Sequence, residues 1–368
     1  MSTVRDFLRK EPVLSIAGAA ALLSMFFVPP SAAYLGYIDL RVLCLLFCLM
    51  AVVVGLQSCG LFDMLSRKLL TGQRSLRSVA VLLVLLPFFS SMLVTNDVAL
   101  ITFVPFAILV LQTIGRRDQL IWVIVLQTVA ANLGSMATPV GNPQNLFLYA
   151  HYTLSAGDFF GRMLPLTLVS LAGLLLLTLF VPKAPIEVTF SGEHDLKNPG
   201  RLAVYGVLFL LCLLSVFRVL PYGILTAAIL LAFLVLDRKA LRRVDYGLLL
   251  TFVFFFIFAG NVGCIPAVRG VLTGLLEKST LLSSVLASQV ISNVPAAVLL
   301  AGFTEDWSGL LCGVNLGGLG TLIASLASLI SFKFYASLPD AKSIRYLGVF
   351  TLVNLAGLAL LIPIALLL

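Results

Sequence analysis

The chain has 368 residues, of which 60% are hydrophobic and 11% are charged, and its net charge is +8. A soluble globular domain carries roughly 25% charged residues, so this composition excludes an ordinary soluble enzyme or binding domain. Apolar runs of roughly 16 to 25 residues recur along the whole length, which predicts an all-α polytopic membrane protein in a lipid bilayer. We assign the positive charge to loops on one membrane face and expect no nucleic-acid partner.

The first half of the chain, 1–182, begins with a basic stretch before its first apolar run. This order also resembles a secretory signal peptide, but further apolar spans follow, so we interpret the run as an uncleaved first helix. The predicted elements are crossings at 13–28, 39–62 and 158–182, a helical hairpin at 78–113 and a broken helix at 120–150.

A long polar stretch, 183–200, separates the two halves and is interpreted as a cytoplasmic linker between repeats. The second half, 201–368, then repeats the same kinds of element. The predicted elements are crossings at 201–217, 221–236, 246–264 and 344–367, a helical hairpin at 267–302 and a broken helix at 308–333.

The distribution of Lys and Arg predicts the orientation. With the N-terminus in the cytoplasm, 19 of the 24 basic residues fall on the cytoplasmic side and 5 on the other. This bias agrees with the positive-inside rule and predicts a multi-pass protein of the inner (plasma) membrane. The rule cannot tell whether each hairpin is re-entrant or crosses twice, because both give the same parity.

Three motifs occur in the same order in both halves. The second and seventh crossings, which carry the first motif, run in opposite directions, so we predict two inverted repeats. The motifs are Gly55 and Cys59 with Gly260 and Cys264, the hairpin tips "VTNDVAL" and "ISNVPAA", and "NLGSMATPVGNPQN" from Asn132 with "NLGGLGTLIASLAS" from Asn315.

The third motif places glycines and prolines inside a segment that should cross the membrane. Such residues interrupt the hydrogen bonds of a helix, and lipid cannot satisfy the freed backbone groups. Inverted repeats with interrupted helices are typical of secondary transporters, whose binding sites use the exposed helix ends. N-terminal helix ends suit an anion, whereas C-terminal ends and unwound carbonyls suit Na⁺.

Polar side chains at the tips and breaks complete the predicted site. The candidate substrate-binding residues are Thr95, Asn96, Asn142, Asn145, Ser292, Asn293, Ser325 and Ser328. The candidate coupling-ion residues are Asn96, Asp97, Thr138, Asn293 and Thr321. Thr321, Ser325 and Ser328 can equally be small residues that allow close helix packing.

Asp97 is the one acid that we place within the membrane core. An ionised carboxylate there is costly unless it is paired or protonated, so a functional role is the default interpretation. Asp97 is therefore a candidate Na⁺ ligand or proton carrier. It can also cap the second helix of its hairpin, and these roles are compatible.

These motifs resemble the ion transporter superfamily with a citrate-transporter-like domain, whose members include divalent anion/sodium symporters and arsenite permeases. Dicarboxylate members carry Ser-Asn-Thr at each tip, where this chain has Thr95-Asn96-Asp97 and Ser292-Asn293-Val294. The Asn-Asp tip is more similar to the arsenite and antiporter branches. The resemblance implies an elevator-type homodimer, with a scaffold from 1–77 and 183–266 and a moving part from 78–182 and 267–368.

The resemblance also implies sodium sites at the tips and substrate between Asn96 and Asn293. We therefore expect a secondary active transporter of a small inorganic or organic anion, coupled to Na⁺ or H⁺, with no other cofactor. The alternatives are a Na⁺/H⁺ antiporter that uses Asp97 as its exchanging carboxylate, or an arsenite-type efflux permease. A passive channel agrees less well with the broken helices. An enzyme is not expected, because the sequence shows no catalytic constellation or metal-ligand cluster.

Overall fold

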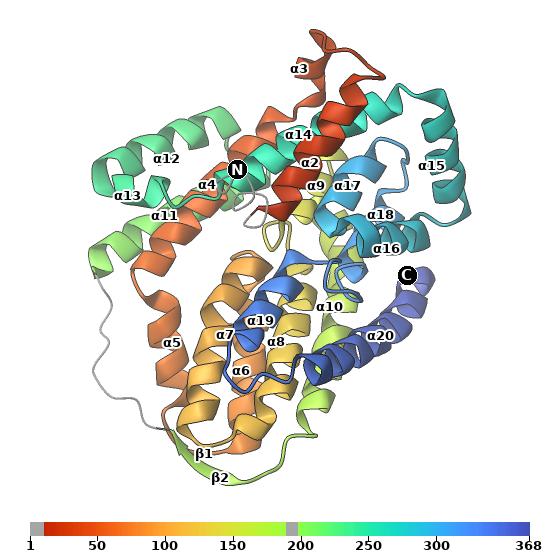
Figure 1. Cartoon of the computed structure of the whole chain (residues 1–368). Helices are drawn as coiled ribbons and strands as arrows, with labels where there is room; N and C mark the ends of the chain where they lie inside the picture. Colours follow the sequence, from red (N-terminus) through yellow and green to blue (C-terminus); the bar gives the residue numbers. More distant parts are fainter. Residues whose placement is uncertain (1–10, 189–197) are drawn as a thin grey trace.

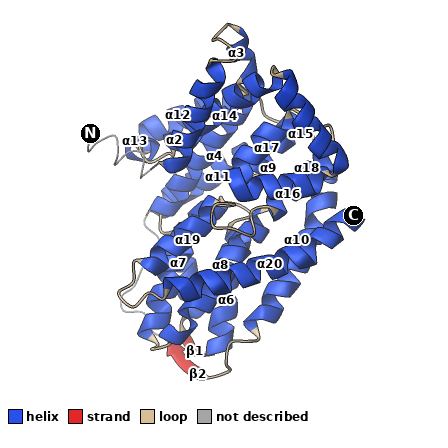
Figure 2. Cartoon of the chain, turned by 45° about the vertical axis from the view of Figure 1, so that its right-hand side comes forward, coloured by secondary structure: helices blue, strands red, loops and turns tan. Residues whose placement is uncertain are grey.

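The computed structural model describes residues 11–188 and 198–368, and these are helical almost throughout (Figures 1 and 2). The first part contains α2 (Pro12–Met25), α3 (Ala33–Tyr37), α4 (Leu40–Ser58), α5 (Leu61–Leu70), β1 (Gly72–Ser75), α6 (Leu76–Ser90), α7 (Asn96–Thr113), η1 (Arg117–Gln119), α8 (Leu120–Ser135), α9 (Pro143–His151), α10 (Ala156–Thr178) and β2 (Pro185–Val188). The second contains α11 (Pro199–Val216), α12 (Tyr222–Leu236), α13 (Arg238–Leu241), α14 (Tyr246–Gly263), α15 (Pro266–Lys278), α16 (Thr280–Ile291), α17 (Asn293–Ala301), α18 (Trp307–Leu316), α19 (Leu326–Ala336) and α20 (Ser343–Leu367).

Six of the described helices are long and apolar enough to cross a membrane: α4, α7, α10, α11, α14 and α20. Six shorter helices are also apolar, namely α2 from Val13, α6, α12, α16, α18 and α19. Many large apolar side chains on these helices are exposed, among them Leu176 and Val235. Such a surface is expected where lipid is the solvent, so the chain is an integral multi-pass membrane protein.

Local sequence signals explain where several helices begin. Asp39 and Asp245 accept hydrogen bonds from the backbone N–H groups of Val42 and Leu248, which caps the N-termini of α4 and α14. Before α10, the side chains and backbone N–H groups of Ser155 and Asp158 form a reciprocal capping box. These polar caps fix the ends of otherwise uniform apolar runs.

Residues 76–113 form α6 and α7, joined at 91–95, and we call this pair the first hairpin. Pro87 lacks the N–H that would bond the Leu83 carbonyl oxygen one turn earlier. Gln127 of α8 replaces that donor, because its Nε2 lies 2.8 Å from the Leu83 oxygen. The hairpin therefore depends on α8 for part of its backbone hydrogen bonding.

The region expected to form the second hairpin, 267–302, differs in detail from a simple pair. It contains three helices, because Ser279 ends α15 and caps α16 through the N–H of Leu282. We use the second hairpin to mean α16 and α17. With 9 residues and a rise of 1.5 Å each, α17 is about 14 Å long and cannot cross a hydrocarbon core of ~30 Å alone.

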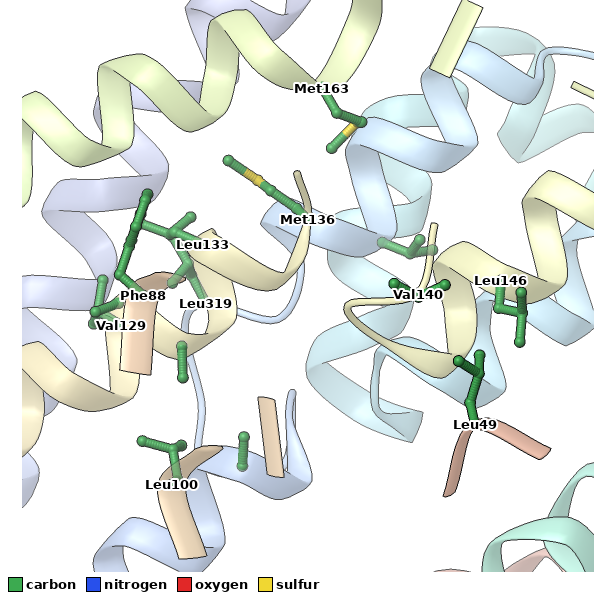
Figure 3. Close-up of a cluster of buried hydrophobic side chains, with 14 of the residues drawn as sticks. Leu49, Phe88, Leu100, Val129, Leu133, Met136, Val140, Leu146, Met163 and Leu319 are labelled. Atoms are coloured by element: carbon green, nitrogen blue, oxygen red, sulfur yellow. The ribbon is translucent and has the colours of Figure 1, made fainter. Parts of the chain in front are cut away.

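The predicted broken helices 120–150 and 308–333 are each two helices in the structure. Residues 136–142, the first broken segment, separate α8 from α9. Residues 317–325, the second broken segment, separate α18 from α19. Figure 3 shows the first segment held among buried apolar side chains, with Met136 and Val140 on the segment and Leu49 approaching from α4.

The packing of the two hairpins follows one pattern. The first hairpin packs on α8, and the second packs on α18. Each later half-helix packs on the other half of the chain, α19 against α7 and α8, and α9 against α17 and α18. The two broken helices therefore interlock at the centre of the molecule.

One element was not expected from the sequence. Gly72–Ser75 pairs antiparallel with Pro185–Val188, with Gly72 opposite Val188 and Ser75 opposite Pro185. This small sheet lies at the lower end of the molecule in Figures 1 and 2 and includes the first residues of the predicted linker 183–200. Residues 189–197 of that linker lie outside the described residues, and its last two residues already belong to α11.

Candidate functional site

Four helices begin around one pocket between the two halves of the folded chain. They are α7, α9, α17 and α19, and the pocket is lined by residues from the first turn of each. Val13 of α2 and Leu248 and Thr251 of α14 form the facing wall. We call this space the central pocket; its lining from the four helix starts is Asn96, Asp97, Pro143, Gln144, Ser292, Asn293, Val294, Pro295, Ser325 and Leu326.

The central pocket is narrow and largely uncharged. Its empty volume is about 420 Å³, but the centre of a water molecule has only about 30 Å³ to occupy. Asp97 is the one ionisable side chain among its described lining residues. The pocket therefore offers neutral polar groups and helix N-termini to a small ligand, with a single carboxylate beside them.

The two hairpin tips share one local geometry. The Oδ1 atoms of Asn96 and Asn293 each accept a hydrogen bond from the next backbone N–H at 3.0 Å. Thr138 Oγ1 donates to the carbonyl oxygen of Met92, and Thr321 Oγ1 donates to that of Gln289. Met92 and Gln289 each lie four residues before the tip asparagine, so the threonines tie each broken segment to its own hairpin in the same way.

The tips differ in two respects. Asn96 Nδ2 donates to Asn132 Oδ1 at 2.9 Å, whereas Asn293 Nδ2 makes no hydrogen bond to any residue in the described ranges. Ser292 has φ +71° and ψ +155°, a backbone conformation that costs a non-glycine residue of order 1–3 kcal/mol. The second tip is thus strained and keeps an unused donor beside the central pocket.

Close helix contacts behind the tips use glycine in both halves. A Cβ on Gly134 would overlap the Phe88 carbonyl oxygen of α6, and a Cβ on Gly317 would overlap Ser288 of α16. Only the absence of a side chain lets each hairpin approach its broken helix so closely.

Asp97 lies between the central pocket and a larger space. Its Oδ1 is buried and has no hydrogen-bond partner among the described residues. Asp97, Pro143 and Leu248 also line the second space, which has an empty volume of about 1160 Å³. We call this space the vestibule; its charged lining residues are Glu11, Asp97, Arg243 and Asp245.

A family model described as citrate transporter matches residues 6–306. This chain belongs to the citrate transporter family. The resemblance inferred from the sequence is therefore confirmed, and the protein is a membrane transporter and not an enzyme.

Relatives of this citrate transporter family member are named as transporters or membrane proteins. An uncharacterized transporter of Methanocaldococcus jannaschii is 33% identical over 78% of this chain and 79% of its own length. The inner membrane protein YbiR of Escherichia coli is 33% identical over 84% of this chain and 83% of its own length. The silicon efflux transporter LSI3 of Oryza sativa is 32% identical, over 52% of this chain and 41% of its own length.

The structure of this family member brings five of the predicted site residues together at one pocket. Asn96, Asp97, Ser292, Asn293 and Ser325 line the central pocket. Thr95 lines the vestibule. The remaining predicted residues do not line the pocket but hold the breaks around it: Asn142, Asn145 and Ser328 are buried in hydrogen bonds, and Thr138 and Thr321 bond the tips as described.

Two asparagines of the site were not among the predicted residues. Asn132 and Asn315 are buried at the ends of α8 and α18 and bond the broken segments. The available signal was the "NLG" that opens the third motif in each half, because both asparagines occupy its first position. Gln144 and Thr251 of the pocket wall carried no such signal.

Proposed function

We propose that this transporter is a secondary active transporter that binds a small anion in the central pocket. The observation that carries the proposal is the convergence of four helix N-termini on one narrow pocket. Each helix start presents N–H groups and the positive end of a dipole, which attract an anion without a Lys or Arg. An anion held only by neutral donors can also leave, as transport requires.

Asp97 supports coupling to a cation. An anion in the pocket would be repelled by an ionised Asp97, so binding of a proton or Na⁺ at this carboxylate favours anion binding. By linkage, the anion favours cation binding to the same extent. This reciprocity is what a symporter requires, and it leaves H⁺ and Na⁺ as the two candidate ions.

The arrangement of the two halves supports alternating access by an elevator-like mechanism. The matching tip bonds and the interlocked broken helices are what two inverted repeats produce. In the proposed state the vestibule opens beside Arg243, which the positive-inside rule places in the cytoplasm. We further propose a homodimer in the inner membrane, with a cytoplasmic N-terminus and the scaffold and moving parts named above.

The test is a flux assay with purified protein in proteoliposomes. Citrate, sulfate, phosphate, arsenite and silicic acid are offered as probes, with imposed Na⁺ or pH gradients. The last two follow from the arsenite-type alternative and from the name of the rice relative. Both are uncharged acids near neutral pH, so flux of these two alone would contradict an anion as the substrate. We expect saturable, gradient-driven flux of at least one probe that falls at least tenfold in Asn293→Ala and stays unchanged in Ser337→Ala, an exposed control at the end of α19. Flux that is unchanged in Asn293→Ala would refute the pocket assignment.

A second candidate function is Na⁺/H⁺ antiport. The observation that favours it is that Asp97 lines both the central pocket and the vestibule, so an exchanging cation could reach it without an anion. It predicts Na⁺-driven proton movement in proteoliposomes that contain none of the anion probes, and loss of this exchange in Asp97→Asn. Exchange that persists in Asp97→Asn excludes this candidate.

A further inference from the structure

Asn132, near the end of α8, reaches from the first half of the chain into the second. Its Nδ2 lies 3.3 Å from Ser328 Oγ and 3.4 Å from the carbonyl oxygen of Gly318. Its Oδ1 accepts a hydrogen bond from Ser325 Oγ at 3.0 Å. All three partners belong to the second broken helix.

Asn315, near the end of α18, reaches from the second half of the chain into the first. Its Nδ2 donates to Asn145 Oδ1 at 2.6 Å, and its Oδ1 accepts from Asn142 Nδ2 at 3.2 Å. Both partners belong to the first broken helix. Asn315 in the third motif corresponds to Asn132, Ser325 to Asn142 and Ser328 to Asn145, so the same pair of contacts is made twice, once in each direction.

Both asparagines are buried, so the loss of their hydrogen bonds is costly. Asn132 and Asn315 are 4% and 3% exposed. A buried amide that loses its partners leaves several polar groups unsatisfied at once, and a buried network is lost more nearly as a unit than bond by bond. The broken segments have in addition given up part of their own helical hydrogen bonding. Side chains of the same half bond several of these backbone groups, Gln289 in the second segment and Asn145 in the first. Each broken helix is in addition bonded by an asparagine from the opposite half.

We propose that Asn132 and Asn315 are positioning residues. Each lies in one half of the chain and holds in place the broken segment of the opposite half. The consequence for transport rests on the proposed function: the four helix starts around the central pocket keep a fixed arrangement and move as one body. Asn132 also accepts the hydrogen bond from Asn96, so the first tip belongs to the same network.

The test is hydrogen–deuterium exchange of the full chain in lipid nanodiscs, which reports local opening without any transported ligand. Asn132→Leu and Asn315→Leu keep the approximate side-chain size and remove the hydrogen bonds. We expect Asn132→Leu to speed exchange in 317–325 by about tenfold and to leave 136–142 within about twofold of the original chain. Asn315→Leu should do the reverse.

This crossed pattern separates the proposal from an ordinary structural role. Faster exchange only in the half that carries the substitution, or equal acceleration of both segments in both variants, would overturn it. If the leucine variants do not fold, Asn132→Ser and Asn315→Ser give the same comparison, because serine is too short to reach the opposite half but can bond its own helix. Since no substrate is used, a failure here is distinct from a failure of the flux assay.

Discussion

At the residue scale, the two tip asparagines have equivalent positions but different hydrogen bonds. Asn96 uses both ends of its amide within the protein, whereas the Nδ2 of Asn293 is unused among the described residues. We infer that Asn293 is the tip residue that donates to a bound anion and that Asn96 mainly holds the site together.

This difference predicts opposite effects of one substitution. Asn293→Asp should weaken the affinity for a transported anion at least tenfold and change the melting temperature little, because under the proposed function the lost donor would contact the ligand. Asn96→Asp should lower the melting temperature by about 2 °C or more, because a carboxylate oxygen would then face Asn132 Oδ1. Flux kinetics and thermal unfolding of both variants provide the measurement, and a larger stability loss in Asn293→Asp would contradict the assignment.

Asp97 provides a prediction about pH. If its carboxylate carries the coupling proton, anion flux driven by a pH gradient should depend on external pH in the original chain and lose that dependence in Asp97→Asn. Asp245 and Glu11 share the vestibule with Asp97, so Asp245→Asn serves as the matched control. Because asparagine caps a helix about as well as aspartate, Asp245→Asn should keep the cap of α14 and leave both the stability and the pH dependence in place. Equal loss of pH dependence in both variants would place the proton site elsewhere.

At the element scale, the first hairpin shows how a proline inside a helix is tolerated. Pro87 frees the Leu83 carbonyl oxygen, and Gln127 of α8 donates to it. Gln127→Leu should therefore destabilise the protein by about 1–3 kcal/mol, measured by reversible unfolding in mixed detergent micelles. Gln112→Leu in α7 is the control, since Gln112 is only partly buried.

A double variant tests the cause. Pro87→Ala restores an N–H that can bond the Leu83 oxygen, so Pro87→Ala combined with Gln127→Leu should recover part of the lost stability. Strictly additive losses would show that Gln127 acts through packing and not through the freed carbonyl.

The elements also show what sequence can and cannot predict here. Uninterrupted apolar runs predicted α4, α10, α14 and α20 to within a few residues, because lipid requires a helix of one length and polarity. The separate α15 was missed, because Ser279 ends it and begins α16 through a cap that depends on local geometry. The sheet of β1 and β2 was missed because it joins segments far apart in the chain and carries little apolar signal.

For the site, the repeated motifs pointed to the two tips and the two breaks, and the structure places residues from all four around one pocket. They could not predict which polar residues face the pocket and which are buried behind it. Asn96 and Asn142 are both asparagines at the start of a helix, but Asn96 lines the pocket whereas Asn142 bonds Asn315 behind it.

At the scale of the whole molecule, the small sheet bears on how the proposed moving part is attached. Under the proposed division, the chain passes between the scaffold and the moving part near residues 77, 182 and 266. A disulfide between Gln73→Cys and Glu187→Cys, which face each other across the sheet, should leave transport unchanged. A bifunctional thiol reagent bridging Leu248→Cys and Pro143→Cys across the central pocket should abolish transport.

Both pairs are made in a Cys264→Ser background, because Cys264 is the exposed native thiol among the six. Transport is compared before and after reduction of the disulfide. A block caused by the Gln73–Glu187 bridge would mean that the two strands separate during the cycle.

The pairing of β1 with β2 has a mechanical consequence. It gathers two of the three chain passages into one ribbon, and the third is the corner between α14 and α15. Under the proposed division, the chain would then join the moving part to the scaffold at two places instead of three. Two points of attachment define one line, so a rotation of the proposed moving part relative to the scaffold would take place about that line.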